Sequence, residues 1–200
     1  MVRERTPGFL EALNYYETPD LRIDLRKYGD ALRRIILRVY LRRVNLYSDV
    51  IPCLTLLQAE GFRLGLLSNG PSFICEAALD RFGLRRFFDY SSSTWALKSF
   101  KPEAKIFLHM TNQLGVEAER TLIVGDSLDR DIQGAKNIGA LSAYLVREHN
   151  VPRNQDALHP VPDIILRDLS ELPLIVRRVT LWARIKYVLK PILDVFQMTN

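Results

Sequence analysis

Residues Leu122–Gly139 read LIVGDSLDRDIQGAKNIG, and this stretch decides the fold. An apolar strand stops at Gly125, two acids follow at Asp126 and Asp131, and the chain then continues as a helix. The carboxyl ends of strands in a parallel α/β protein bind ligands, and carboxylates placed there suit a hard divalent cation such as Mg²⁺. The alternative interpretation is a strand followed by an ordinary helix cap.

The composition is that of a globular protein. The 200-residue chain is 48% hydrophobic and 26% charged, which is sufficient for one main core. Its two cysteines, Cys53 and Cys75, belong to no metal-binding pattern and are interpreted as free thiols in a reducing compartment. The first residues are charged and contain no long apolar run, so the sequence predicts no secretory signal and no transmembrane segment, and favours the cytoplasm.

The net charge is +5, and many of the arginines fall between Arg22 and Arg43. Arg34, Arg38 and Arg42 recur every fourth residue, which predicts the solvated side of an amphipathic helix. No zinc-finger, basic-zipper or aromatic RNA-binding signature accompanies this charge, so no nucleic-acid partner is predicted. An anionic substrate would benefit from the positive field. The expected apolar face of the helix comprises Leu32, Ile35, Ile36, Val39, Tyr40 and Leu46.

The sequence predicts a helical segment over residues 1–46, an α/β core over 47–173 and a basic amphipathic helix over 174–200. Strands alternate with helices in the core, which favours a Rossmann-like, three-layer parallel sheet covered on both faces. The expected strands are 62–68, 88–91, 121–124, 141–146 and 163–166, and the expected helices are 49–60, 72–82, 102–114 and 129–138.

Two further clusters follow expected strands. Ser68, Asn69 and Gly70 can offer a hydroxyl, an amide and free backbone N–H groups to an oxyanion, although an ordinary Asn-Gly turn has the same sequence. Lys101-Pro102 opens a helix and can bring a positive charge to a phosphate. The conjunction of these clusters with the two-acid turn is more informative than any one of them.

In this order, the three clusters resemble the motifs of the haloacid dehalogenase-like (HAD) hydrolase superfamily, phosphatase type. The resemblance extends from about residue 47 to 172. It implies a Rossmann-like core, a Mg²⁺ ion and phosphoryl transfer through an aspartyl-phosphate intermediate. The stretches that carry it are LLSNG at 66–70, KP at 101–102 with IF at 106–107, and VGDSLDRD at 124–131 with GA at 134–135 and G at 139.

The resemblance implies a role for each matching residue. Ser68 would hold the phosphoryl group with the backbone of Asn69 and Gly70, and Lys101 would balance its charge. Asp126 would bind Mg²⁺, and Asp131 would either ligate the metal through water or orient Lys101.

The paired acids resemble the Mg²⁺-dependent phosphatases of the superfamily, in contrast to its metal-free dehalogenases. The expected substrate is a small phosphorylated metabolite, and residues 1–46 resemble part of a helical cap.

The first motif of the family, a central strand ending in Asp-x-Asp, is missing from this chain. The nearest substitute, Asp24 in Leu21-Arg22-Ile23-Asp24, follows an alternating pattern and lacks a second acid. Without the strand, two apolar neighbours would have unpaired backbone edges. We therefore expect that the protein begins upstream of Met1, that the flanking strands pair directly, or that another segment or chain fills the position. The first option is favoured.

Two function classes follow. The protein is expected to be a Mg²⁺-dependent phosphatase, or else a catalytically inactive HAD-fold protein with a binding or regulatory role.

From Arg177 onward, helical spacing of apolar residues predicts a basic helix that packs on the parent fold, on a second subunit as a homo-oligomer, or on an anionic membrane. Trp95 is interpreted as a packed loop residue, with a position bordering the site as the alternative.

Overall fold

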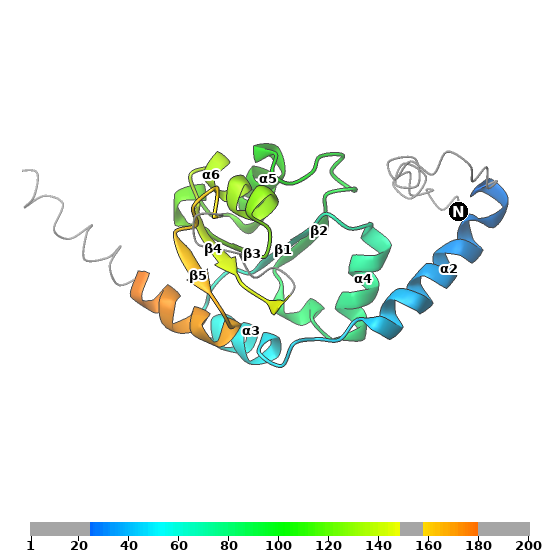
Figure 1. Cartoon of the computed structure of the whole chain (residues 1–200), viewed down its shortest axis with the longest axis horizontal. Helices are drawn as coiled ribbons and strands as arrows, with labels where there is room; N and C mark the ends of the chain where they lie inside the picture. Colours follow the sequence, from blue (N-terminus) through cyan, green and yellow to red (C-terminus); the bar gives the residue numbers. More distant parts are fainter. Residues whose placement is uncertain (1–24, 149–157, 180–200) are drawn as a thin grey trace, which may run out of the picture.

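The structure is a computed structural model that describes residues 25–148 and 158–179 (Figure 1). A π-helical turn, Leu128–Ile132, precedes the last of the named α-helices, and residues 172–179 are also helical. The helices are α2 (Leu25–Arg43), α3 (Val50–Ala59), α4 (Ser72–Arg81), α5 (Ala104–Leu114) and α6 (Gln133–Asn137). The strands are β1 (Gly65–Ser68), β2 (Tyr90–Ser93), β3 (Leu122–Gly125), β4 (Leu141–Leu145) and β5 (Ile164–Leu166).

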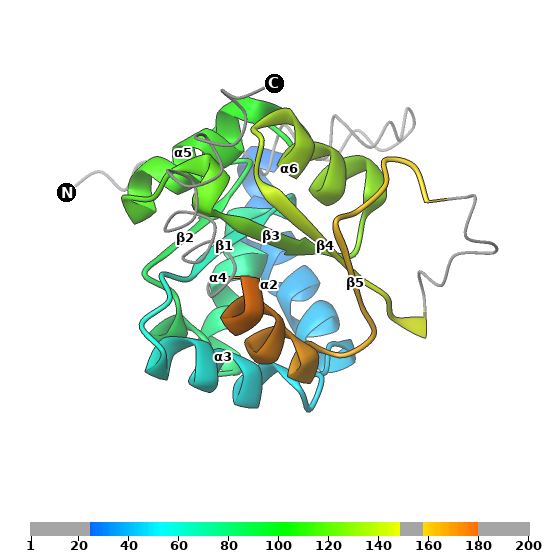
Figure 2. The same ribbon diagram turned by 90° about the vertical axis from the view of Figure 1, so that its left-hand side faces the viewer.

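The strands form two parallel sheets, β1–β2 and β3–β4–β5. Figure 2 shows the strands following one another across the molecule in the order β2, β1, β3, β4, β5. Helices α5 and α6 lie on one side of the strands, and α3, α4 and the helix at 172–179 lie on the other. The predicted α/β, Rossmann-like three-layer architecture is confirmed.

Several element bounds differ from the prediction. β1 begins at Gly65, later than expected, because Leu64 N and Arg63 bind the carboxylate of Asp89 at 2.9 and 2.6 Å ahead of the β1–β2 ladder. β2 likewise begins at Tyr90 and extends to Ser93. α5 begins at Ala104 because Glu103, with an extended backbone, forms its N-cap.

β1 and β3 do not pair with each other in the described structure, so one of the three alternatives, direct pairing of the flanking strands, is wrong. Their residues Leu66, Leu67 and Leu122–Gly125 are half-buried, whereas the central residues of β4 are buried. β4 has a hydrogen-bonded neighbour on each side, while β1 and β3 each have one. The sheet is therefore divided between β1 and β3, where the missing strand was expected.

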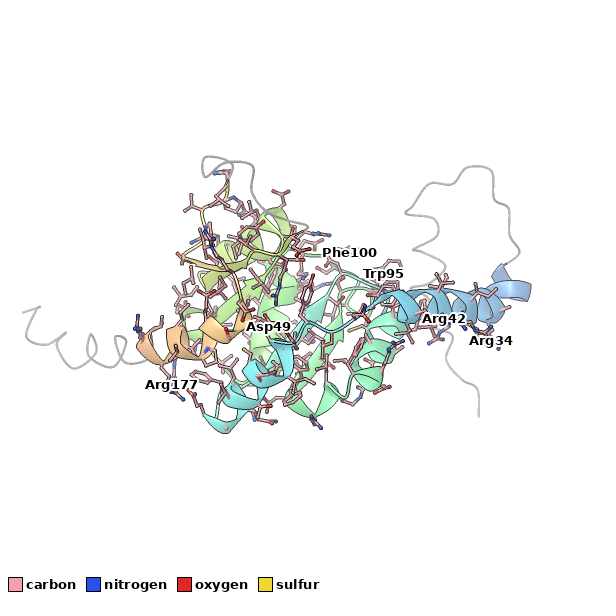
Figure 3. The ribbon with its side chains drawn as sticks, turned by 60° about the horizontal axis from the view of Figure 1, so that its bottom comes forward. Arg34, Arg42, Asp49, Trp95, Phe100 and Arg177 are labelled. Carbon is pink, nitrogen blue, oxygen red and sulfur yellow. The ribbon has the colours of Figure 1, made fainter. Side chains whose placement is uncertain are left out.

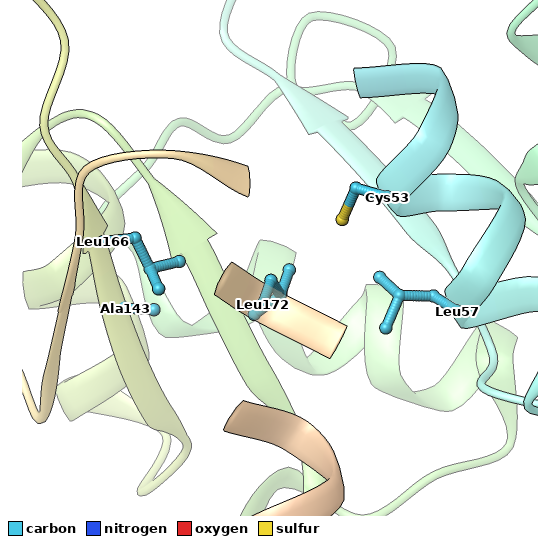
Figure 4. Packing of buried hydrophobic residues seen from close by; sticks show 5 residues of the cluster. All are labelled: Cys53, Leu57, Ala143, Leu166 and Leu172. Atoms are coloured by element: carbon cyan, nitrogen blue, oxygen red, sulfur yellow. The ribbon is translucent and has the colours of Figure 1, made fainter. Parts of the chain in front are cut away.

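The core packs α3 and the helix at 172–179 against β4 and β5 (Figure 4). Its buried members are Cys53, Leu57, Ala143, Leu166 and Leu172. Burial raises the pKa of the Cys53 thiol to about 11, with smaller contributions from the nearby charges of Asp49 and Asp168. The predicted free thiol is thus a neutral core group.

Helix α2 extends away from the sheets (Figure 1) and meets the rest of the protein mainly at α4. Arg34, Arg38 and Arg42 are exposed, as predicted, and Figure 3 shows Arg34 and Arg42 on the projecting helix. The predicted apolar face is wrong in part, because Ile35 and Val39 are 59% and 49% exposed. Because α2 packs mainly on α4, it cannot bury a wide apolar face.

Some predictions concern residues outside the described ranges. These are the substitute strand ending at Asp24, the rest of the helical segment before Leu25, and the basic helix beyond residue 179, with its role in oligomerisation or packing. Among the described helices, none combines the length and apolar character needed to cross a bilayer.

Close packing of α6 on α5 generates a prediction. A Cβ on Gly134 would lie 2.1 Å from Cε2 of Phe107, so Gly134→Ala should destabilise the fold by about 1–3 kcal/mol. The matched control is Gly29→Ala on α2, because a Cβ at this position would meet no atom within 4 Å beyond its own stretch of helix. This substitution should stabilise the fold by roughly 0.5–1 kcal/mol. Urea unfolding measures both, and equal effects of the two substitutions would contradict the packing.

Asp163 links β5 to β4 and α6. Its carboxylate accepts hydrogen bonds from Lys136 Nζ at 2.7 Å and from the Ser142 backbone N and Oγ at 2.9 and 2.6 Å. Burial acts to raise the pKa of Asp163, but these hydrogen bonds and the Lys136 charge outweigh it, so the pKa lies below its usual value. The ionised carboxylate therefore stabilises the folded state.

This stability should be present above the unfolded-state pKa of about 3.9 and be lost as the pH falls through the lower folded-state pKa. Asp163→Asn should therefore destabilise the protein at neutral pH, and the difference from wild type should shrink in acid. Urea unfolding at about pH 6 and about pH 3 measures that difference. A difference that stays constant or grows in acid would refute the assignment.

Candidate active site

Ser68 ends β1 and begins a tight loop that places Asn69 and Gly70 next to it. The Gly70 backbone N donates to Ser68 Oγ at 3.1 Å. A hydroxyl that accepts an N–H directs its own hydrogen to another acceptor, so Ser68 can donate to a bound oxyanion. The loop is half-buried, which leaves these polar groups partly accessible.

Lys101 bridges the two sheets at their carboxyl ends. Its Nζ donates to the Leu67 carbonyl of β1 at 3.2 Å and to Asp131 Oδ1 at 2.6 Å. The side chains of Lys101 and Asp131 are only 15% and 8% exposed, so this ion pair is largely shielded from water. The Lys101 backbone N also donates to Asn69 Oδ1 at 3.1 Å, which connects it to the Ser68–Gly70 loop.

Asp131 is positioned by the turn that follows β3. Its Oδ2 accepts the Ser127 backbone N–H at 3.1 Å, and its own N–H donates to the Ser127 carbonyl at 2.8 Å. The side chain lies against the backbone of Gly125, where a Cβ would be 2.3 Å from Asp131 Cβ. The turn is π-helical, a form that often occurs at functional sites. Glycine at 125 is required for this close approach.

Asp126 lies at the end of β3 and is exposed. Burial raises the pKa of the neighbouring Tyr144, and the negative charge of Asp126 raises it further. Tyr144 is in register with Gly125 on the adjacent strand, so the Asp126 carboxylate lies beside the ends of β3 and β4.

The last residue of β2 and the loop after it hold the Ser68–Gly70 loop in place, a role that the sequence did not reveal. Ser93 Oγ donates to the Gly70 carbonyl at 2.6 Å, and the Thr94 backbone N donates to the Ser68 carbonyl at 2.9 Å. Hydroxyl residues at the carboxyl end of a strand in a parallel sheet were the available signal.

Trp95 belongs to the same loop, and its indole Nε1 donates to the Asn69 carbonyl at 2.8 Å. Its ring meets that of Phe100 edge to face, with centroids 6.2 Å apart (Figure 3). Trp95 is thus a packed loop residue, as predicted, and the loop that it contacts is the Ser68–Gly70 loop.

Hydrogen bonds, together with the backbone of the Ser68–Gly70 loop, thus connect five of the predicted site residues: Ser68, Asn69, Gly70, Lys101 and Asp131. Asp126 adjoins them through Ser127. No cluster of three or more potential metal-ligating side chains is found among residues 25–148 and 158–179. Because Mg²⁺ often takes only one or two carboxylates and completes its shell with water and phosphate oxygens, the exposed Asp126 still fits such an ion.

Comparison with known proteins identifies the family. The sequence profile of the haloacid dehalogenase-like hydrolases matches residues 2–139, well over half of the chain. The chain belongs to this family.

Relatives of the chain include named phosphatases. It is 36% identical over 134 residues to the glyceraldehyde 3-phosphate phosphatase of Methanopyrus kandleri, covering 66% of this chain and 56% of that protein. It is 29% identical over 157 residues to the N-acylneuraminate-9-phosphatase of Rattus norvegicus, covering 78% of this chain and 62% of that protein. The chain therefore spans little more than half the length of these relatives.

A solved structure shows the same architecture. The crystal structure of a HAD phosphatase from Thermococcus onnurineus superimposes with a TM-score of 0.65 at 29% identity, covering 84% of this chain and 77% of that one.

The shielded ion pair generates a prediction. Lys101→Met leaves the Asp131 carboxylate buried without its counter-charge and should destabilise the fold by about 3–5 kcal/mol. The control is Glu76→Gln, which removes an ion pair with Arg85 whose side chains are about half exposed, and should cost less than about 1 kcal/mol. Urea unfolding compares the two variants, and a Lys101→Met effect no larger than the control would contradict the shielding.

Proposed function

We propose that this protein is a Mg²⁺-dependent phosphatase of small phosphorylated metabolites. The observation that carries the proposal lies at the carboxyl ends of β1 and β3, where Lys101 is hydrogen-bonded to Asp131, to the Leu67 carbonyl and to Asn69, the residue next to Ser68. Relatives named for glyceraldehyde 3-phosphate and N-acylneuraminate 9-phosphate support small phosphate monoesters as the substrate class. The two free thiols are consistent with the reducing cytoplasm as its location.

In this proposal the phosphoryl group binds over the Ser68–Gly70 loop. The Ser68 hydroxyl donates to one phosphoryl oxygen, and the Asn69 backbone N–H offers a further donor. Lys101 brings a positive charge to the same position and balances the charge that develops during transfer. Both oxygens of Asp131 are already bound, to Lys101 and to Ser127 N, which supports the orienting role rather than a metal-ligating one.

Asp126 is the residue that would hold Mg²⁺. Its exposed carboxylate follows β3 directly and adjoins the turn that contains Asp131. The ion would neutralise charge on the phosphoryl oxygens and leave the remaining ligand positions to water and substrate.

The attacking carboxylate is expected between the ends of β1 and β3. The division of the sheet leaves one edge of each of these strands without a hydrogen-bonded neighbour in the described structure. A strand inserted there in parallel would deliver its last side chains next to Ser68 and Lys101.

The lack of such a strand in the described structure favours the second candidate, a non-catalytic HAD-fold protein that binds a phosphorylated ligand without turnover.

The experiment measures hydrolysis of p-nitrophenyl phosphate and of sugar phosphates by the full chain, with Mg²⁺ and with EDTA. Turnover should require Mg²⁺, and Asp126→Asn should lower kcat/KM by about 100-fold or more. Asp129→Asn is the matched control, because it removes another exposed acid of the same turn and should leave turnover close to the wild-type value.

Binding separates the two candidates. Isothermal titration calorimetry with inorganic phosphate and Mg²⁺ tests the site independently of chemistry. Phosphate binding without turnover would count against catalysis by this chain in its present form, which lacks the Asp-x-Asp strand, and turnover abolished by Asp126→Asn would reject the non-catalytic protein.

A further inference from the structure

Three consecutive backbone carbonyls of the Ser68–Gly70 loop are bound by Ser93, the last residue of β2, and by the two residues that follow it. The Ser68 carbonyl accepts from Thr94 N, the Gly70 carbonyl accepts from Ser93 Oγ, and the Asn69 carbonyl accepts from the indole of Trp95. Of these three donors, only the indole belongs to a large side chain, so this contact can be removed by substitution while an aromatic ring is kept.

The Trp95 contact fixes the direction of the Gly70 N–H. The Asn69–Gly70 peptide is not among the cis bonds of the described chain, and in a planar trans peptide the C=O and N–H point in opposite directions. Holding the Asn69 carbonyl toward Trp95 therefore turns the Gly70 N–H away from it. That N–H donates to Ser68 Oγ at 3.1 Å.

The Gly70 N–H in turn orients the Ser68 hydroxyl. A hydroxyl oxygen that accepts one hydrogen bond sends its own hydrogen elsewhere, and hydrogen bonds joined in series polarise one another. The result is a series of hydrogen bonds that all run in one direction. The Trp95 indole donates to the Asn69 carbonyl, and the Gly70 N–H of the same peptide donates to the Ser68 hydroxyl. The Ser68 hydroxyl can then donate to an oxyanion.

We propose that Trp95 is a positioning residue of the phosphate site, which orients the Ser68 hydroxyl through the Asn69–Gly70 peptide. This inference rests on the proposed function and adds a residue outside the three motif clusters. Trp95 itself contacts the loop and Phe100, and acts on the ligand through Ser68.

The test is a double-mutant cycle with inorganic phosphate and Mg²⁺ as the probe, measured by calorimetry on the full chain. Trp95→Phe keeps an aromatic ring and removes the donor, and should weaken phosphate binding by about fivefold, the size of one hydrogen bond. Ser68→Ala should also weaken binding. In the Ser68→Ala background, Trp95→Phe should add no further loss, because its effect passes through that hydroxyl.

The control is Phe100→Leu, which alters the aromatic contact of Trp95 while leaving the indole N–H in place, and should keep wild-type phosphate affinity. Wild-type affinity in Trp95→Phe, or additive losses in the double variant, would overturn the inference. If wild type itself binds no phosphate, the proposed function fails and the inference falls with it. Phosphate binding that depends on Ser68 but not on Trp95 refutes only the inference.

A second measurement needs no substitution at Trp95, so it holds even if Trp95→Phe does not fold. The chain has two tryptophans, and Trp182→Phe leaves the Trp95 indole as its only indole N–H resonance. Adding phosphate should shift this resonance, because binding at Ser68 repolarises the chain of hydrogen bonds. A resonance that stays in place while calorimetry shows binding would overturn the inference.

Discussion

The ion pair between Lys101 and Asp131 is the interaction on which the candidate site depends. The Lys101 ammonium contacts the Leu67 carbonyl of β1 on one side and, through Asp131, the turn after β3 on the other. Each charge is shielded from water and is tolerated because the other is present. The pair therefore fixes the relative position of two strand ends that no ladder of backbone hydrogen bonds connects.

The division of the sheet explains why this connection and the helix packing matter. β1 and β3 carry apolar sequences suited to the middle of a sheet, yet their residues are only half-buried. The two sheets are held together where α5, which covers β1 and β2, packs on α6, which covers β4. The contact of Phe107 with Gly134 lies in that helix pair. Within residues 25–148 and 158–179, the α5–α6 packing and the Lys101–Asp131 ion pair thus connect the two sheets.

The local sequence predicted the order of the core elements well, because each strand and helix has its own hydrophobic periodicity and many end at a glycine. It predicted the bounds of β1 and α5 less well, since the Asp89 contacts and the extended Glu103 backbone decide where pairing and helix begin. The prediction of a buried apolar face on α2 was wrong in part, because periodicity shows only that a helix has two faces. It does not show whether a neighbour covers one of them. The sequence likewise did not reveal the partner of Trp95, which is 26 residues away.

By itself the sequence determined the family, the parallel α/β class and the residues to compare, because motif spacing and strand periodicity are local properties of the chain. Only the tertiary structure decided that one oxygen of Asp131 binds Lys101 and the other binds Ser127 N, and that the indole of Trp95 binds the Ser68–Gly70 loop. It also decided that β1 and β3 do not pair with each other in the described part of the chain. The reason is physical: hydrogen-bond partners and burial depend on which distant segments meet, and a linear pattern contains no such distances.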